Sequence, residues 1–234
     1  GRALQRFRNP LLVDALLEES LSRLRSDPQE AHALAECASD VALRLPHPQV
    51  GRAWAMTCVA RANAYRANAL RVCGELGRAD ELIAFATQMF HDEGNDDPLV
   101  LGELLEMAAT LRREQRRYRE GVELLQRAER VYLDCGQLAL LPRILISAGK
   151  LLHEAGEVEA ALEKVDEALD RIDPERDLPL HYVALHNRMD YLQALGKNEE
   201  ALAALEALGR LEEIRPEPLD LVRRDWVAGR IYRG

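Results

Sequence analysis

A pattern of small residues that returns every 40 residues constrains this 234-residue chain more than any other feature. The pattern is clearest in the segment 142–174, where apolar and small residues recur at helical spacing up to Gly156 and resume after it. Two helices can approach closely only where neither carries a bulky side chain, and Gly149, Ala161 and Ala168 are small at helical spacing. The segment therefore predicts two helices that fold back on each other at Gly156.

The same pattern is found before and after this segment. A shift of 40 residues in either direction aligns Arg116 and Gly196 with Gly156, Gly121 and Ala201 with Ala161, and Ala128 and Leu208 with Ala168. One helical hairpin cannot bury its apolar face alone, so hairpins of this kind stack on one another. The low aromatic content of 5 % fits helices that pack through Leu and Ala. The sequence thus predicts an all-α chain of stacked hairpins without strands.

The pattern resembles that of the tetratricopeptide repeat family, in a long-repeat, bacterial-type variant of about 40 residues rather than the usual 34 or so. The strongest match is Gly149, Gly156, Ala161, Ala168 and Pro174. The repeats depart from the family because they have no Trp at its opening aromatic position. The resemblance implies an all-α fold, a right-handed α-α superhelix (solenoid) of antiparallel helix hairpins with about eleven helices.

We expect a single repeat domain over residues 1–234. It would begin with a cap-like hairpin at 10–45, because Pro10 and the pair Asp27-Pro28 are signals for helix starts. Four repeats are expected next, at 49–91, 98–135, 138–174 and 178–214, and residues 218–234 are expected to form the first helix of an incomplete repeat. A last helix without its hairpin partner leaves its packing face open, which predicts further repeats or self-association at the C-terminal end.

Composition argues against several classes of protein. The net charge of −9 disfavours nucleic acid as a partner, because that interaction depends on neutralising phosphates. Neither a signal peptide nor a membrane-spanning run is found, so we expect no membrane association. The four cysteines, Cys37, Cys58, Cys73 and Cys135, lack CxxC spacing, which predicts reduced, buried thiols and a cytoplasmic location.

The sequence predicts that the chain is not an enzyme and has no catalytic residue, metal ion or cofactor. It contains no nucleophile-elbow, phosphate-loop or dinucleotide-binding motif. HEAGE at 153–157 resembles half of a zinc-protease motif, but the second His is missing. The basic run RREQRRYR at 112–119 has two interpretations: a phosphate-binding patch, or arginines that pair with Glu114 and Glu120 on neighbouring turns.

In the resembled family, the first helix of each hairpin lines a concave groove. The matching positions that could contact a partner here are Arg61, Asn68, Arg71, Arg113, Arg143, Lys150, His153, His186, Asn187, Arg223, Trp226 and Arg230. Arg side chains can hold carboxylates through two hydrogen bonds, and Trp226 could serve as an aromatic anchor. The alternative is that these are simply the polar residues that any exposed helix face requires. The second helices carry much of the acid, so the groove could be locally basic.

These observations favour a non-catalytic protein–protein interaction scaffold that binds a partner segment, such as an acidic peptide, in its groove. Two alternatives remain. The chain could be a sensor or regulatory repeat domain of a larger signalling or transcription protein, or it could be a structural accessory subunit of a large complex. The expected partner in each case is a protein or peptide, without nucleic acid or membrane.

Overall fold

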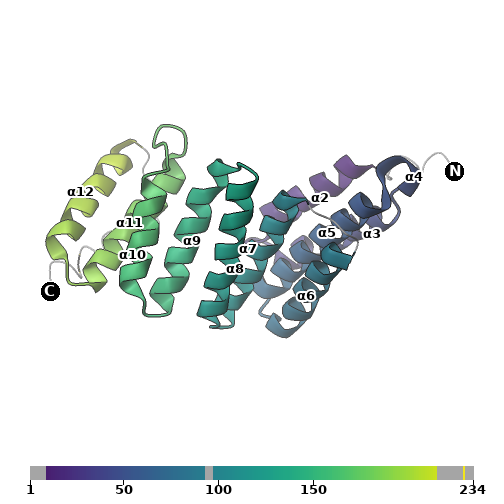
Figure 1. Cartoon of the computed structure of the whole chain (residues 1–234), viewed down its shortest axis with the longest axis horizontal. Helices are drawn as coiled ribbons and strands as arrows, with labels where there is room; N and C mark the ends of the chain where they lie inside the picture. Colours follow the sequence, from purple (N-terminus) through teal and green to yellow (C-terminus); the bar gives the residue numbers. More distant parts are fainter. Residues whose placement is uncertain (1–8, 93–96, 215–228, 230–234) are drawn as a thin grey trace. The chain divides into compact units, whose positions relative to one another are not determined.

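The computed structural model describes residues 9–92, 97–214 and 229, and every regular element in these ranges is a helix (Figure 1). The helices are α2 (Pro10–Arg23), α3 (Pro28–Leu43), α4 (His47–Val50), α5 (Arg52–Val72), α6 (Leu76–Asp92), α7 (Pro98–Glu114), α8 (Tyr118–Asp134), the 3-10 turn η1 (Leu138–Leu140), α9 (Leu141–Glu154), α10 (Val158–Leu169), α11 (Leu178–Ala194) and α12 (Asn198–Ile214). The all-α architecture of hairpins is as predicted. The chain divides into two compact units, Gly1–Val131 and Tyr132–Gly234.

The first unit is built on α5, which packs against both α3 and α6. Two helices that contact α5 begin at capping residues. At the start of α3 the Asp27 carboxylate accepts from the backbone N–H of Glu30 at 2.9 Å, and at the start of α7 the Asp97 carboxylate accepts from the backbone N–H of Leu99 at 3.0 Å. Small residues dominate the contacts, and Ala35, Ala60 and Ala79 are completely buried. Alanine at these positions lets the helix backbones approach closely.

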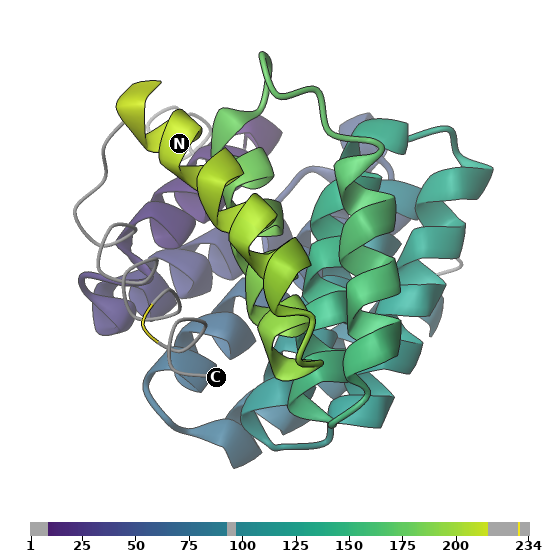
Figure 2. The ribbon, with the colours of Figure 1, turned by 90° about the vertical axis from the view of Figure 1, so that its left-hand side faces the viewer.

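In the second unit, α9 and α10 form the hairpin that the segment 142–174 predicts. Gly156 holds the turn with φ 84°, and Ala161 and Ala168 are completely buried. α11 packs on α10 and pairs with α12. The connection from α10 to α11 forms a loop that projects beyond the helix ends in both views (Figure 1 and Figure 2).

The repeat expected at 49–91 has its first long helix, α5, beginning only at Arg52, because Gly51 adopts a left-handed φ of 81° that separates α5 from the short α4. The helix expected at 218–234 lies outside the described residues, apart from Gly229. A single domain over 1–234 stays a prediction.

The cysteines are free thiols, as expected, but most of them are not buried. Cys37 and Cys73 are exposed and Cys135 is half-buried, so the prediction of buried thiols was wrong for these three. Cys37 lies on the side of α3 away from its buried residues, and Cys73 and Cys135 lie at the ends of α5 and α8, where apolar neighbours in sequence do not guarantee cover. Only Cys58 lies in the core, where burial raises the pKa of its thiol to about 11.

Arg116 occupies the turn between α7 and α8, where the repeat pattern places glycine elsewhere. Its φ is 59°, and among the described residues it is the one non-glycine with a positive φ. A residue with a side chain destabilises the folded state by about 1–2 kcal/mol when its backbone is left-handed. Glycine avoids this strain, but it also makes the unfolded chain more flexible, which offsets part of the gain in stability. We expect Arg116→Gly to raise the free energy of unfolding by about 0.5–1 kcal/mol in urea denaturation.

The reverse substitution, which adds a side chain at a left-handed turn, provides a matched test. Gly156→Ala places a Cβ at a turn with φ 84° and should lower the free energy of unfolding by about 1 kcal/mol. If Arg116→Gly also destabilised the protein, the positive φ at Arg116 would not be a source of strain.

Candidate functional site

Arg61, a predicted groove residue on α5, holds together three first helices of the first unit. Its Nη1 donates to Asp14 Oδ1 on α2 at 2.8 Å, and its Nε donates to Glu103 Oε2 on α7 at 2.9 Å. The Tyr65 hydroxyl donates to the other oxygen of Glu103 at 2.6 Å. Burial opposes the charge of Arg61, but the two carboxylates outweigh it and hold its pKa above the ordinary value. The network is thus a structural clamp.

Three further groove residues, Asn68, Arg71 and Arg113, form a network with the carboxylate of Glu114. Arg71 Nε donates to Asn68 Oδ1 at 3.0 Å, and its Nη1 lies 3.3 Å from Glu114 Oε1. Arg113 donates to the same Glu114 oxygen at 2.8 Å. Only 14 % of the Arg71 side chain is exposed, and burial lowers its pKa. In the first unit, then, the predicted groove arginines already have carboxylate partners within the chain, which offsets their positive charge.

The groove residues of the second unit that the structure describes lie on α9 and α11. Arg143 and Lys150 are exposed on α9, and their spacing of seven places them within about 20° of each other around the helix. His153 stacks on Tyr191 of α11 with ring centroids 4.8 Å apart, and its Nε2 lies 3.9 Å from Asp190 Oδ2. We name Arg143, Lys150 and His153, with the half-buried His186 and Asn187 of α11, the α9/α11 face. The remaining predicted residues, Arg223, Trp226 and Arg230, lie outside the described residues, Gly229 being the one described position near them.

The basic run 112–119 is tied into ion pairs. Arg112 Nη1 lies 2.5 Å from Asp80 Oδ1 of α6, and Arg117 Nη2 lies 2.5 Å from Glu120 Oε2. These pairs support the interpretation in which the arginines pair with carboxylates near the turn between α7 and α8, rather than the phosphate-binding patch. A similar pair joins α11 to α10, where Arg188 donates to Asp166 at 2.6 Å.

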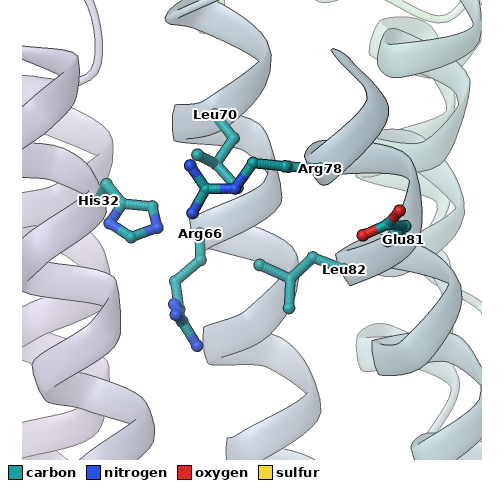
Figure 3. A pocket seen from close by; sticks show the side chains of 6 residues that line it. All are labelled: His32, Arg66, Leu70, Arg78, Glu81 and Leu82. Atoms are coloured by element: carbon teal, nitrogen blue, oxygen red, sulfur yellow. The ribbon is translucent and has the colours of Figure 1, made fainter. Parts of the chain in front are cut away.

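A pocket that the sequence analysis did not identify lies between α3, α5 and α6 (Figure 3). It has a volume of about 240 Å³ and is lined by His32, Arg66, Leu70, Arg78, Glu81 and Leu82. These residues belong to three helices and share no position in the repeat pattern, so only the fold brings them together. Arg66 lies about 140° around α5 from Arg61, which places the pocket on the opposite side of that helix from the predicted groove residues.

Two general features bear on what the chain can do. Within the described ranges, no three His, Cys, Asp or Glu side chains come close enough together to hold a metal ion. Among the helices of the same ranges, none has the length and apolar character of a membrane span.

Comparison with known proteins gives similarity at the level of structure. No protein-family model matches the chain, and no curated protein matches its sequence. The TPR-like repeats of a kinesin light chain from Podosopora anserina superpose with a TM-score of 0.63 at 17 % identity, over 89 % of this chain and 99 % of that one.

Two further solved structures agree. RapI matches with a TM-score of 0.66 at 13 % identity, over 95 % of this chain and 72 % of its own. PilF of Pseudomonas aeruginosa matches with a TM-score of 0.59 at 18 % identity, over 95 % of this chain and 93 % of its own. At such low identity the likeness concerns the fold and not the activity.

Proposed function

We propose that this chain, which has a tetratricopeptide-type repeat fold, binds a segment of a partner protein on the α9/α11 face. One observation carries the proposal: Arg143 and Lys150 project from α9 as exposed cations on one face, in a protein whose net charge is −9. The comparable arginines of the first unit are much less exposed, with 24 % of the Arg61 side chain and 14 % of the Arg71 side chain open to solvent. The exposure of these two cations supports contact with a partner.

The chemistry of this face favours an acidic segment. A guanidinium can bind a carboxylate by donating two parallel hydrogen bonds, and an ammonium adds a positive charge with three N–H donors that can rotate toward an acceptor. The partly exposed ring of His153 lies beside the cations and packs on the buried ring of Tyr191. Because exposed charges carry the contact, affinity is expected to fall as salt rises. We infer a non-catalytic interaction role, and the exposed thiols of Cys37 and Cys73 support a reducing compartment such as the cytoplasm.

The test compares variants that change charge equally on different faces. Arg143→Glu combined with Lys150→Glu reverses the two exposed cations of α9. Arg127→Glu combined with Arg130→Glu makes the same change on α8, a second helix, where both side chains are exposed. Each charge-assisted hydrogen bond contributes about 1.5–3 kcal/mol, so loss of both should weaken partner capture at least about tenfold.

The measurement is capture from lysate of the source organism by immobilised protein at low and high salt, quantified by mass spectrometry. We expect a partner with an acidic segment to be retained by wild type and by the α8 variant, to be lost from the α9 variant, and to be released by salt. Equal retention by the α9 variant and wild type would refute the proposed face.

A further inference from the structure

We propose that the pocket between α3, α5 and α6 binds a small organic carboxylate on a short aliphatic stem. The pocket is separate from the α9/α11 face, since all of its lining residues belong to the first unit. The inference therefore goes beyond the proposed function and does not depend on it. It rests on the shape of the pocket, its donors and its apolar residues.

The hollow arises because α3 and α6 both pack on α5 and leave a space over it. Arg66 and Leu70 come from α5, His32 reaches toward them from α3, and Arg78 and Leu82 reach toward the same space from α6 (Figure 3). Its volume of about 240 Å³ lies below the roughly 300–1,000 Å³ of pockets for drug-sized molecules. The pocket therefore suits a fragment of a few carbon atoms rather than a nucleotide or a large cofactor.

The hydrogen-bonding groups of the pocket contain more donors than acceptors. Arg66 donates to Asn63 Oδ1 and Glu36 Oε1, both at 3.0 Å, while its Nε is shielded from solvent without a partner in the described part of the chain. The Nε2 atom of His32 is in the same situation. A guanidinium has five N–H donors, and Arg78 uses only Nη1 in its bond to Glu75. A ligand that offers oxygen acceptors would complete this arrangement.

The charges and apolar residues define the rest of the ligand. Two guanidiniums favour an anionic acceptor, and small movements of Arg66 and His32 toward a bound carboxylate would give their shielded nitrogens a partner. Leu70 and Leu82 offer contact to an aliphatic stem, which a bare inorganic anion lacks. Glu81 stands on the side away from His32 and repels a carboxylate there, so it orients the charged end toward His32 and Arg66 (Figure 3).

His32 provides a direct readout. Burial, and then the charges of Arg66 and Arg78, lower the pKa of its imidazole, while Glu36 and Glu75 act in the opposite direction. A carboxylate bound beside the ring must raise this pKa, because it favours the protonated form. The chain has six histidines, and a His32→Asn variant assigns the signal of His32 in NMR spectra.

The experiment titrates the full chain with 4-methylvalerate and, separately, with the neutral 4-methylvaleramide of the same shape. We expect the carboxylate to shift the His32 ring signals saturably and to raise the pKa of His32, and the amide to do neither. Arg78→Gln should weaken the binding of 4-methylvalerate by about fivefold or more, and Glu81→Gln should strengthen it by about twofold. Arg78 is largely exposed, so its replacement leaves the fold intact.

Three results would overturn the inference. One is the absence of any shift at His32 with 4-methylvalerate, and another is an equal response to the amide. The third is an equal response to inorganic phosphate, because it would show that the leucines do not select a stem.

Discussion

Replacing Glu103 with alanine is expected to lower the free energy of unfolding by about 3 kcal/mol, because two buried donors lose their acceptor together. Glu103 accepts from Arg61 Nε at 2.9 Å and from the Tyr65 hydroxyl at 2.6 Å. The side chains of Arg61 and Glu103 are only 24 % and 28 % exposed, so water can replace the lost partner only in part. Asp14 would remain paired with Arg61.

Urea denaturation of Glu103→Ala, Glu103→Gln and Asp40→Ala measures this effect. The glutamine retains a carbonyl oxygen as acceptor but not the charge, so about half of the loss should remain. Asp40 pairs with Arg44 on the surface, with both side chains about 60 % exposed, and its removal should cost less than about 0.5 kcal/mol. A loss for Glu103→Ala no larger than that for Asp40→Ala would show that the clamp contributes nothing.

Replacing Gly149 with leucine is expected to destabilise the second unit by about 3 kcal/mol, because α9 and α10 touch at this residue. A Cβ on Gly149 would lie 3.1 Å from the carbonyl oxygen of Ala161 and 3.6 Å from Cε2 of Tyr191. The carbonyl belongs to the backbone of α10 and cannot move without the helix. A larger side chain must therefore separate the two helices or displace the ring of Tyr191.

Two controls separate crowding from the general effect of removing a glycine from a helix. Gly77→Leu on α6 adds the same side chain where nothing lies within 4 Å of the new Cβ, and we expect it to be neutral or stabilising, since glycine is unfavourable in helices by about 1 kcal/mol. Gly149→Ala should lie near neutral, because the gain in helix propensity offsets the 3.1 Å contact. The measurement is thermal unfolding followed by circular dichroism, and a Gly149→Leu variant as stable as Gly77→Leu would contradict the close crossing.

The repeat pattern allowed the hairpins to be predicted because it follows from local geometry. Small residues must lie where helices cross, and the turn after the first helix needs a left-handed residue. Gly149, Gly156 and Ala161 meet those demands in sequence and occupy the expected places in the structure. Arg116 is not a glycine, but the 40-residue shift still placed it at the turn, where its φ is positive. The break at Gly51 was missed, since a single glycine at a helix start is compatible with either conformation.

The side-chain partners could not be predicted in the same way. Asp14 and Glu103 are 47 and 42 residues from Arg61 in sequence, and residue spacing within a repeat does not reveal which carboxylate a guanidinium will meet. The groove positions were therefore chosen as residue types on one face, without knowledge of which were already paired. The pocket around Arg66 and His32 was missed for the same reason, because it depends on how three helices pack.

The central claim is that a partner binds the α9/α11 face, and site-specific photocrosslinking tests it most directly. A benzoylphenylalanine at position 147, on α9 between Arg143 and Lys150, is compared with the same residue at position 127, on the exposed face of α8. After irradiation in cells of the source organism, we expect a defined adduct with one partner protein from position 147 and none from position 127. An adduct from position 127 alone would contradict the account and place the partner on the second helices.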